Sequence, residues 1–191
     1  MRTVFFDVDT QIDFMYPAGA LYVPGAERIL PAVVKLNRYA AANGIVVVST
    51  MDAHSEDDPE FKAWRPHCVG GTVGQQKPQD SLLERRATIQ SAATKIDWNG
   101  AQQILLEKQT FDCFANPNLL PLLKELDAER YVVYGVVTEI CVKHAVSGLL
   151  GTGKPVELVT DAVRHLKESD RDAMLSDFAA RGGTLTTADH F

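Results

Sequence analysis

Short apolar runs rich in β-branched residues alternate along this chain with segments of helical periodicity. Near-continuous apolar strands are typical of a parallel sheet buried on both faces by helices. The alternation therefore predicts an α/β fold, a three-layer α/β/α sandwich around a mainly parallel six-stranded sheet. The expected strands are residues 2–8, 45–50, 103–107, 131–134, 155–160 and 183–186. The expected helices are residues 26–43, 118–126, 142–150 and 168–180, with Ala173, Met174 and Phe178 facing inward in the last.

A length of 191 residues suits a single domain, here residues 1–191, with a sizeable core. Residues 55–100 contain no long periodic segment and are rich in Gly, Pro and charge. Because a connection of this length inside one domain is usually functional, we interpret it as a long active-site loop. Some local helix is expected around residues 81–86.

Composition narrows the class of partner and the cellular compartment. The net charge of -6, with no cluster of Lys and Arg, argues against nucleic acid as a partner. No apolar run reaches the length of a membrane span and no signal peptide precedes the first strand, so we expect a cytoplasmic protein that does not bind membranes. The chain has 3 cysteines, an odd number that argues against a disulfide framework.

Cys141 lies where the fourth apolar strand gives way to a helix. Unpaired amides and the positive end of the helix dipole at such a position favour a thiolate, which makes Cys141 a candidate nucleophile. A cysteine among Ile140, Val142 and Ala145 is, however, more often a small core residue.

Two further candidates follow other strands. Asp9 comes directly after the first strand and Lys108 after the third. Ligand sites in parallel sheets form where the carboxyl ends of neighbouring strands meet, so Asp9, Lys108 and Cys141 can share one crevice. A carboxylate can take the proton of a thiol, and an ammonium can orient that carboxylate. Alternatively, Asp9 caps a turn and Lys108 is a solvated surface residue.

Asp52, His54 and His67 form a second candidate group. One carboxylate and two imidazoles suit one divalent transition metal, with Zn²⁺ preferred over Fe²⁺ or Mn²⁺. Glu60 is a candidate fourth ligand. The alternative is that D-x-H occurs here by chance and that His67 and Glu60 are solvated loop residues.

The motifs together resemble the nicotinamidase and isochorismatase-like cysteine hydrolase superfamily. The resemblance rests on five stretches in order, from residue 4 to about 162, and is closest to nicotinamidases. They are Asp9-x-Gln11-x-Asp13-Phe14, Asp52-x-His54, Trp64-x-Pro66-His67-Cys68 with Gly71-Thr72, Lys108 after a strand, and Gly135-Val136-Val137-Thr138-Glu139-x-Cys141-Val142.

This resemblance implies an isochorismatase-like, Rossmann-like fold and a role for each matching residue. Asp9, Lys108 and Cys141 would be a catalytic triad, and Asp52, His54 and His67 a metal site. A cis peptide between Val136 and Val137 would let the amides of Val137 and Cys141 form an oxyanion hole. Phe14 and Trp64 would hold a planar ring. Members of the family also form homo-oligomers, which is the expectation here.

The metal residues favour nicotinamidase activity, the hydrolysis of nicotinamide to nicotinate and ammonia through a thioester. Isochorismatases and many carbamoyl-cleaving relatives generally lack this set. One departure is that Phe111-Asp112-Cys113-Phe114-Ala115-Asn116-Pro117 stands where nicotinamidases often carry a Tyr and a Ser-Gly-Phe run. Alternatives are therefore a cysteine hydrolase of another small amide or carbamoyl compound, hydrolysis of the isochorismate vinyl ether, and a non-catalytic binding member of the fold.

Overall fold

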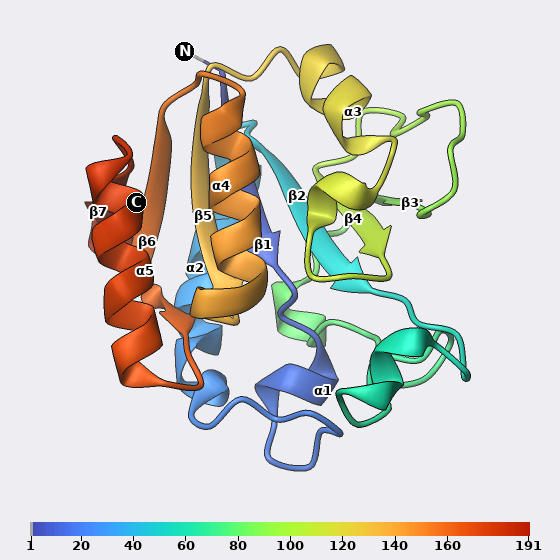
Figure 1. Cartoon of the computed structure of the whole chain (residues 1–191). Helices are drawn as coiled ribbons and strands as arrows, with labels where there is room; N and C mark the ends of the chain where they lie inside the picture. Colours follow the sequence, from blue (N-terminus) through green and yellow to red (C-terminus); the bar gives the residue numbers. More distant parts are fainter. Residues whose placement is uncertain (1) are drawn as a thin grey trace.

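The computed structural model describes residues 2–191 and contains one seven-stranded sheet in which every neighbouring pair of strands is parallel. The strand order is β3-β4-β2-β1-β5-β6-β7 (Figure 1). The strands are β1 Thr3–Val8, β2 Val46–Asp52, β3 Arg86–Ile89, β4 Gln103–Lys108, β5 Arg130–Val136, β6 Val156–Arg164 and β7 Thr184–Thr186.

The all-parallel α/β architecture is as predicted, but the expected six strands are one too few. The missing strand is β3, which lies inside the segment interpreted as a loop. Two residues of β3 are exposed and one is half-buried, so it lacks the apolar run that marks a buried strand. Its position at the edge, paired only with β4, explains why apolar patterning does not reveal it.

The helices are α1 Ile12–Met15, α2 Leu30–Ala42, α3 Leu119–Glu125, α4 Lys143–Gly151 and α5 Glu168–Ala180. Helix α1 was not predicted, whereas α3, α4 and α5 begin and end within one residue of the predicted bounds, and α2 follows a 3-10 turn, Ala26–Ile29, that occupies the start of the predicted helix. Two expectations are wrong. The local helix expected around residues 81–86 is a short 3-10 turn, Gln79–Ser81, that ends where the expected helix would begin. Ala173 is exposed on α5, because only Met174 and Phe178 of that helix are buried.

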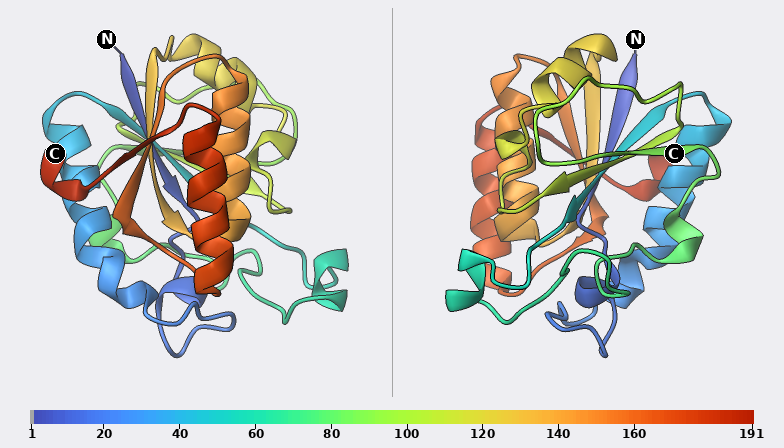
Figure 2. Two further views of the ribbon diagram at one scale, coloured as in Figure 1. Left: turned by 60° about the vertical axis from the view of Figure 1, so that its left-hand side comes forward. Right: turned by 90° about the vertical axis from the view of Figure 1, so that its right-hand side faces the viewer.

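Helices cover both faces of the sheet and bury two apolar clusters (Figure 2). On one face α2 packs through Val33, Leu36 and Ala40. On the other face lie α3, α4 and α5. Alternate residues of β1 serve the two clusters, with Phe5 on the α2 face and Phe6 on the opposite face, because strand side chains alternate in direction.

The carboxyl ends of β1 and β5 meet at the point where the strand order reverses. In sheets of this kind such a crevice is the usual ligand site. Gly135 brings the two strands together there: it has a φ of 120°, and an added Cβ would lie 2.1 Å from the carbonyl oxygen of Val8. Only glycine fits this approach. Among residues 2–191, no helix is both long and apolar enough to cross a membrane.

Candidate active site and metal centre

Asp9, Lys108 and Cys141 lie together at the carboxyl ends of β1, β4 and β5. Lys108 Nζ lies 2.8 Å from Asp9 Oδ2 and 3.9 Å from Cys141 Sγ. All three side chains are buried, with Lys108 only 1% exposed. The alternative of a solvated Lys108 is therefore wrong, and the three residues share one crevice as the strand ends predict.

Asp9 is held in an uncommon backbone conformation. Its φ is 50°, in the left-handed region that non-glycine residues seldom adopt. Its amide donates to the carbonyl of Thr50 at 3.1 Å, and Thr50 Oγ1 donates to Asp9 Oδ1 at 2.6 Å. These contacts from β2 fix the direction of the Asp9 carboxylate toward Lys108.

Cys141 follows β5 through one turn of π-helix, Thr138–Val142, which leads into α4. The Val136–Val137 peptide bond is cis, as the family resemblance implies. Cys141 and Val137 both line the pocket described below. Short π-helical turns occur frequently at functional sites.

Burial raises the pKa of the Cys141 thiol well above its usual range, and the charge of Lys108 offsets only part of this effect. The nearby carboxylates of Asp9 and Asp52 raise that pKa further. These shifts oppose the thiolate that the start of the helix was expected to favour, so a base that takes the thiol proton would assist attack by the sulfur.

Asp52 joins the triad to the metal residues, an arrangement that the motifs do not reveal. It pairs directly with Lys108 in the register of β2 and β4, and its Oδ1 accepts a very short hydrogen bond from Lys108 Nζ. Burial raises the pKa of Asp9, an effect that Lys108 opposes without cancelling. Burial acts on Asp52 in the same direction, but Lys108 and His54 outweigh it and lower its pKa. The two carboxyl groups around one lysine thus have pKa values shifted in opposite directions.

Asp52, His54 and His67 form a compact donor set. One potential ligand atom from each lies within 4.8 Å of the others. Asp52 Oδ2 is 3.8 Å from His54 Nε2 and 3.9 Å from His67 Nε2. Glu60 Oε1 lies 3.8 Å from His67 Nε2, at the edge of this group.

Both imidazoles are oriented by bonds at their other nitrogen. His54 Nδ1 lies 3.0 Å from Asp58 Oδ2, and His67 Nδ1 lies 2.7 Å from the carbonyl of Arg65. Each Nδ1 therefore carries a proton that it donates, and each Nε2 is turned toward Asp52. Among the described residues 2–191, His54 Nε2 is buried and has no hydrogen-bond partner. A buried, unpartnered nitrogen facing a carboxylate and a second imidazole fits a divalent metal.

Asp58 was not identified as a site residue from the sequence, although its position four residues after His54 could have indicated a contact with that imidazole. Gln11 was also missed: it belongs to the first motif, but no role was assigned to it. Its side chain exchanges two hydrogen bonds with the backbone of Asp52, at 2.7 and 2.8 Å. Gln11 thereby fixes the strand end that carries the Asp52 carboxylate.

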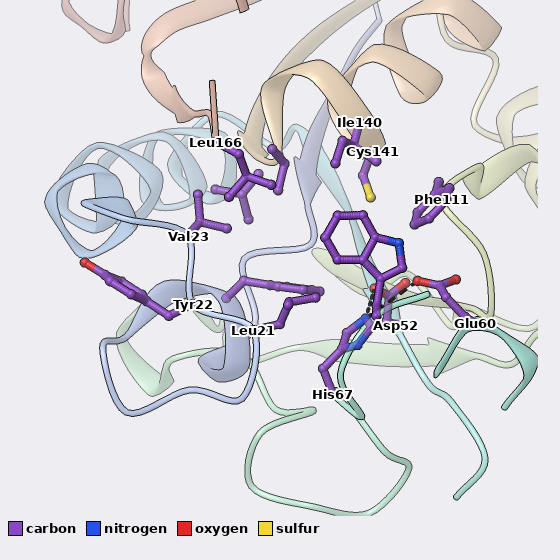
Figure 3. A pocket seen from close by; sticks show the side chains of 14 residues that line it. Leu21, Tyr22, Val23, Asp52, Glu60, His67, Phe111, Ile140, Cys141 and Leu166 are labelled. Carbon is purple, nitrogen blue, oxygen red and sulfur yellow. Dashed lines mark ion pairs between the residues drawn. The ribbon is translucent and has the colours of Figure 1, made fainter. Parts of the chain in front are cut away.

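One pocket connects the triad with the metal residues. It has an empty volume of about 510 Å³, and its wall is mostly apolar. The Cys141 sulfur points into it from one side, while Asp52, Glu60 and His67 lie on the opposite side (Figure 3). Apolar and aromatic residues complete the wall: Phe14, Leu21, Tyr22, Val23, Trp64, Phe111, Val136, Val137, Ile140 and Leu166.

The predicted ring-binding residues Phe14 and Trp64 are both in this wall. Phe111 stands beside Trp64, with ring centroids 6.4 Å apart and planes at 79°. Phe111 belongs to the segment in which the sequence departs from nicotinamidases, and that segment does supply part of the pocket. Tyr22 and Leu166 belong to none of the motifs, and the sequence did not predict that they line the pocket.

Comparison with known proteins defines the class to which this fold and site belong. The isochorismatase domain family matches residues 3–190, and the chain belongs to that family. Among individual relatives, the nicotinamidase of Escherichia coli (strain K12) is 25% identical, over 94% of this chain and 92% of that protein. A probable inactive nicotinamidase of Arabidopsis thaliana is 23% identical, over 84% of this chain and 80% of its own length.

A solved structure gives the same class. The pyrazinamidase of Pyrococcus horikoshii, determined in complex with zinc, superposes with a TM-score of 0.81 and 26% identity, covering 98% of this chain and 99% of its own. The sequence resemblance to the isochorismatase-like superfamily is thus confirmed.

Proposed function

We propose that the protein is a metal-containing cysteine amidohydrolase that converts nicotinamide to nicotinate and ammonia. The observation that carries this proposal is a pocket lined by Cys141 on one side and by Asp52 and His67 on the other. Lys108 and Asp9 are buried behind Cys141, and His54 completes the donor set of Asp52 and His67. A flat ring between aromatic walls can then present its carboxamide to the sulfur and its ring nitrogen to the opposite side.

In the proposed reaction Asp9 takes the proton of Cys141, and the sulfur attacks the carboxamide carbon. The raised pKa of Asp9 suits a general base that must deprotonate a thiol. The amides of Val137 and Cys141 stabilise the oxyanion. Asp9 then gives its proton to the departing ammonia, a thioester remains, and water hydrolyses it to the carboxylate with Asp9 again as base.

Lys108 keeps the Asp9 carboxylate in place and limits repulsion among the anionic groups around it. Asp52, His54 and His67 would hold the metal, with Glu60 as a candidate fourth ligand. Zn²⁺ is the preferred ion, by the donor set and by the zinc in the Pyrococcus horikoshii pyrazinamidase. When bound, it would hold the ring nitrogen of the substrate. Phe14 and Trp64 would bind the faces of the ring.

A second candidate function is hydrolysis of another small amide or carbamoyl compound. Phe111 favours this second function. It lines the pocket, and it belongs to the segment, residues 111–117, that departs from the sequence that nicotinamidases often carry.

The test is ammonia release from a panel of amides that includes nicotinamide, pyrazinamide and N-carbamoyl compounds. We expect nicotinamide to give the highest kcat/KM, and Cys141→Ala to reduce turnover by at least about 10³-fold. Wild-type turnover by Cys141→Ala on every amide would refute the nucleophile. Full nicotinamidase activity in a metal-free preparation would refute the metal's role.

A further inference from the structure

A second lysine–carboxylate pair is buried beside the first, under the α2 face of the sheet. Lys77 Nζ lies 3.2 Å from Asp7 Oδ2, and both side chains are fully buried. Asp7 is on β1, two residues before Asp9, whereas Lys77 comes from the long segment between β2 and β3. Neither residue lines the pocket.

Polar neighbours surround the pair. Asp7 accepts hydrogen bonds from Thr10 Oγ1 at 2.6 Å and from Ser49 Oγ at 2.9 Å. Lys77 Nζ donates to Thr10 Oγ1 at 3.0 Å and contacts the Asp7 carbonyl at 3.5 Å. A buried pair contributes little net stability compared with apolar side chains of the same volume, so its presence calls for a role other than stability.

Thr10 connects the pair to the catalytic turn. Its hydroxyl donates to Asp7 and accepts from Lys77, so both charged residues fix the residue that directly follows Asp9. Asp9 itself has a φ of 50°, which persists only where surrounding contacts enforce it. Thr50 and Lys108 hold the Asp9 side chain, whereas Thr10 holds the backbone on its carboxyl side.

Lys77 also anchors a segment that pairs with the same turn. The carbonyls of Gly74 and Gln76 accept from the amides of Asp13 and Ile12, at 3.0 and 2.8 Å. The carbonyl of Gln75 accepts from Gln11 Nε2 at 2.7 Å. Because Gln11 also bonds the backbone of Asp52, the segment that Lys77 anchors reaches both the base and the metal carboxylate.

We propose that Asp7, Lys77 and Thr10 form a positioning clamp that holds Asp9 in its catalytic conformation. The clamp residues are positioning residues, not catalytic ones, since they act through the backbone at residues 9–13. This inference rests on the proposed function, because it assigns the clamp to the same reaction.

The sharpest test is Thr10→Val, which removes the shared hydroxyl and keeps both charges. We expect kcat for nicotinamide to fall about tenfold or more with KM within about twofold, because a small misplacement of a catalytic group lowers turnover strongly. Alkylation of Cys141 by iodoacetamide, followed by mass spectrometry, should slow by a similar factor, since Asp9 no longer assists its deprotonation. Thr10→Ser keeps the hydroxyl and should restore both rates.

Two further variants separate positioning from stability. Tyr134→Phe removes the hydrogen bond from the buried Tyr134 hydroxyl to Asn37 and leaves Thr10 untouched; it should lower the urea midpoint without changing kcat. The double variant Asp7→Leu/Lys77→Met replaces the pair by apolar groups; it should keep or raise the urea midpoint while kcat stays low.

Wild-type kcat and wild-type alkylation in both Thr10→Val and the double variant would overturn the clamp. Failure of the proposed function is a separate result. If the wild type hydrolysed no nicotinamide, the alkylation rates of Cys141 in these variants would still decide whether the clamp positions Asp9.

Discussion

Two buried lysines meet the carboxyl end of β1, and they sit in very different surroundings. Lys77 pairs with Asp7 in a closed cluster, where Thr10 and Ser49 complete the contacts of the carboxylate. Lys108 is shared among Asp9, Asp52 and Cys141 in an open cluster beside the pocket. Asp7 lies on β1 and Asp9 lies directly after that strand, so two acids only two residues apart belong to different clusters.

The open cluster contains more acidic groups than its single cation can balance. Burial raises the pKa values of Asp9 and Cys141, and Lys108 opposes both shifts. In the proposed reaction a proton passes from the thiol to the carboxyl group of Asp9. Burial of a charge pair does not by itself indicate catalysis; in the open cluster, Lys108 joins Cys141 and Asp52, which both line the pocket.

The largest expected difference between the clusters is in turnover. Asp9→Asn removes the base and should lower kcat by about 10²–10⁴-fold, the usual contribution of general acid–base catalysis. The matching change in the closed cluster, Asp7→Asn, should cost only about tenfold, because it acts through the position of Asp9. Steady-state ammonia release measures both. Equal losses in the two variants would remove the distinction between the clusters.

Stability should show the opposite order. Asp7→Asn leaves Lys77 as a buried charge without its carboxylate partner, which should cost about 3–5 kcal/mol of unfolding free energy. Asp9→Asn should cost less, because Lys108 retains Asp52 as a partner. Urea unfolding of the metal-free proteins gives both values. A larger loss for Asp9→Asn would contradict this order and would mean that Asp52 alone does not compensate the charge of Lys108.

A smaller effect, on zinc affinity, is expected from Asp58, which contacts the candidate metal ligand His54. Its two oxygens accept from His54 Nδ1 and from the Glu60 amide, so Asp58→Asn must lose one of these contacts. Zinc affinity should fall about 10–100-fold, as is typical for groups that orient a ligand. Competition with a chelator measures it. Asp57→Asn, the exposed neighbour, is the control and should bind zinc like the wild type.

The smallest expected effect is the pH dependence of zinc binding. Burial lowers the pKa of His54, but the carboxylates of Asp52 and Asp58 outweigh it and raise the pKa to about 9. Burial lowers the pKa of His67 below its usual value. Between about pH 7 and 8 zinc must therefore displace one proton from His54 and none from a neutral His67. Affinity should rise by up to about tenfold over this pH unit.

Calorimetry in two buffers of different ionisation enthalpy counts the protons released. A value near two per zinc would show that His67 is also protonated before binding. A value near zero would contradict the raised pKa of His54.

The local sequence pattern predicted most of the sheet and the groups that end its strands. Apolar runs set β1, β2, β4, β5 and β6, and the parallel direction brings their carboxyl ends to one edge. Asp9, Lys108 and Cys141 could therefore be placed near one another from the sequence. The resemblance assigned them to one triad, because strand ends alone leave open that Asp9 caps a turn and that Lys108 is a surface residue.

Only the tertiary structure decided which groups form ion pairs and in which direction burial shifts their pKa values. The edge strand β3 depends on pairing with β4 and not on its own apolar residues. Burial raises the pKa of Cys141, against the effect expected of the helix start, and desolvation is not a local property. The Asp7–Lys77 pair joins residues 70 positions apart. Periodicity and strand ends reflect local physics, whereas burial and long-range pairing exist only once the chain has folded.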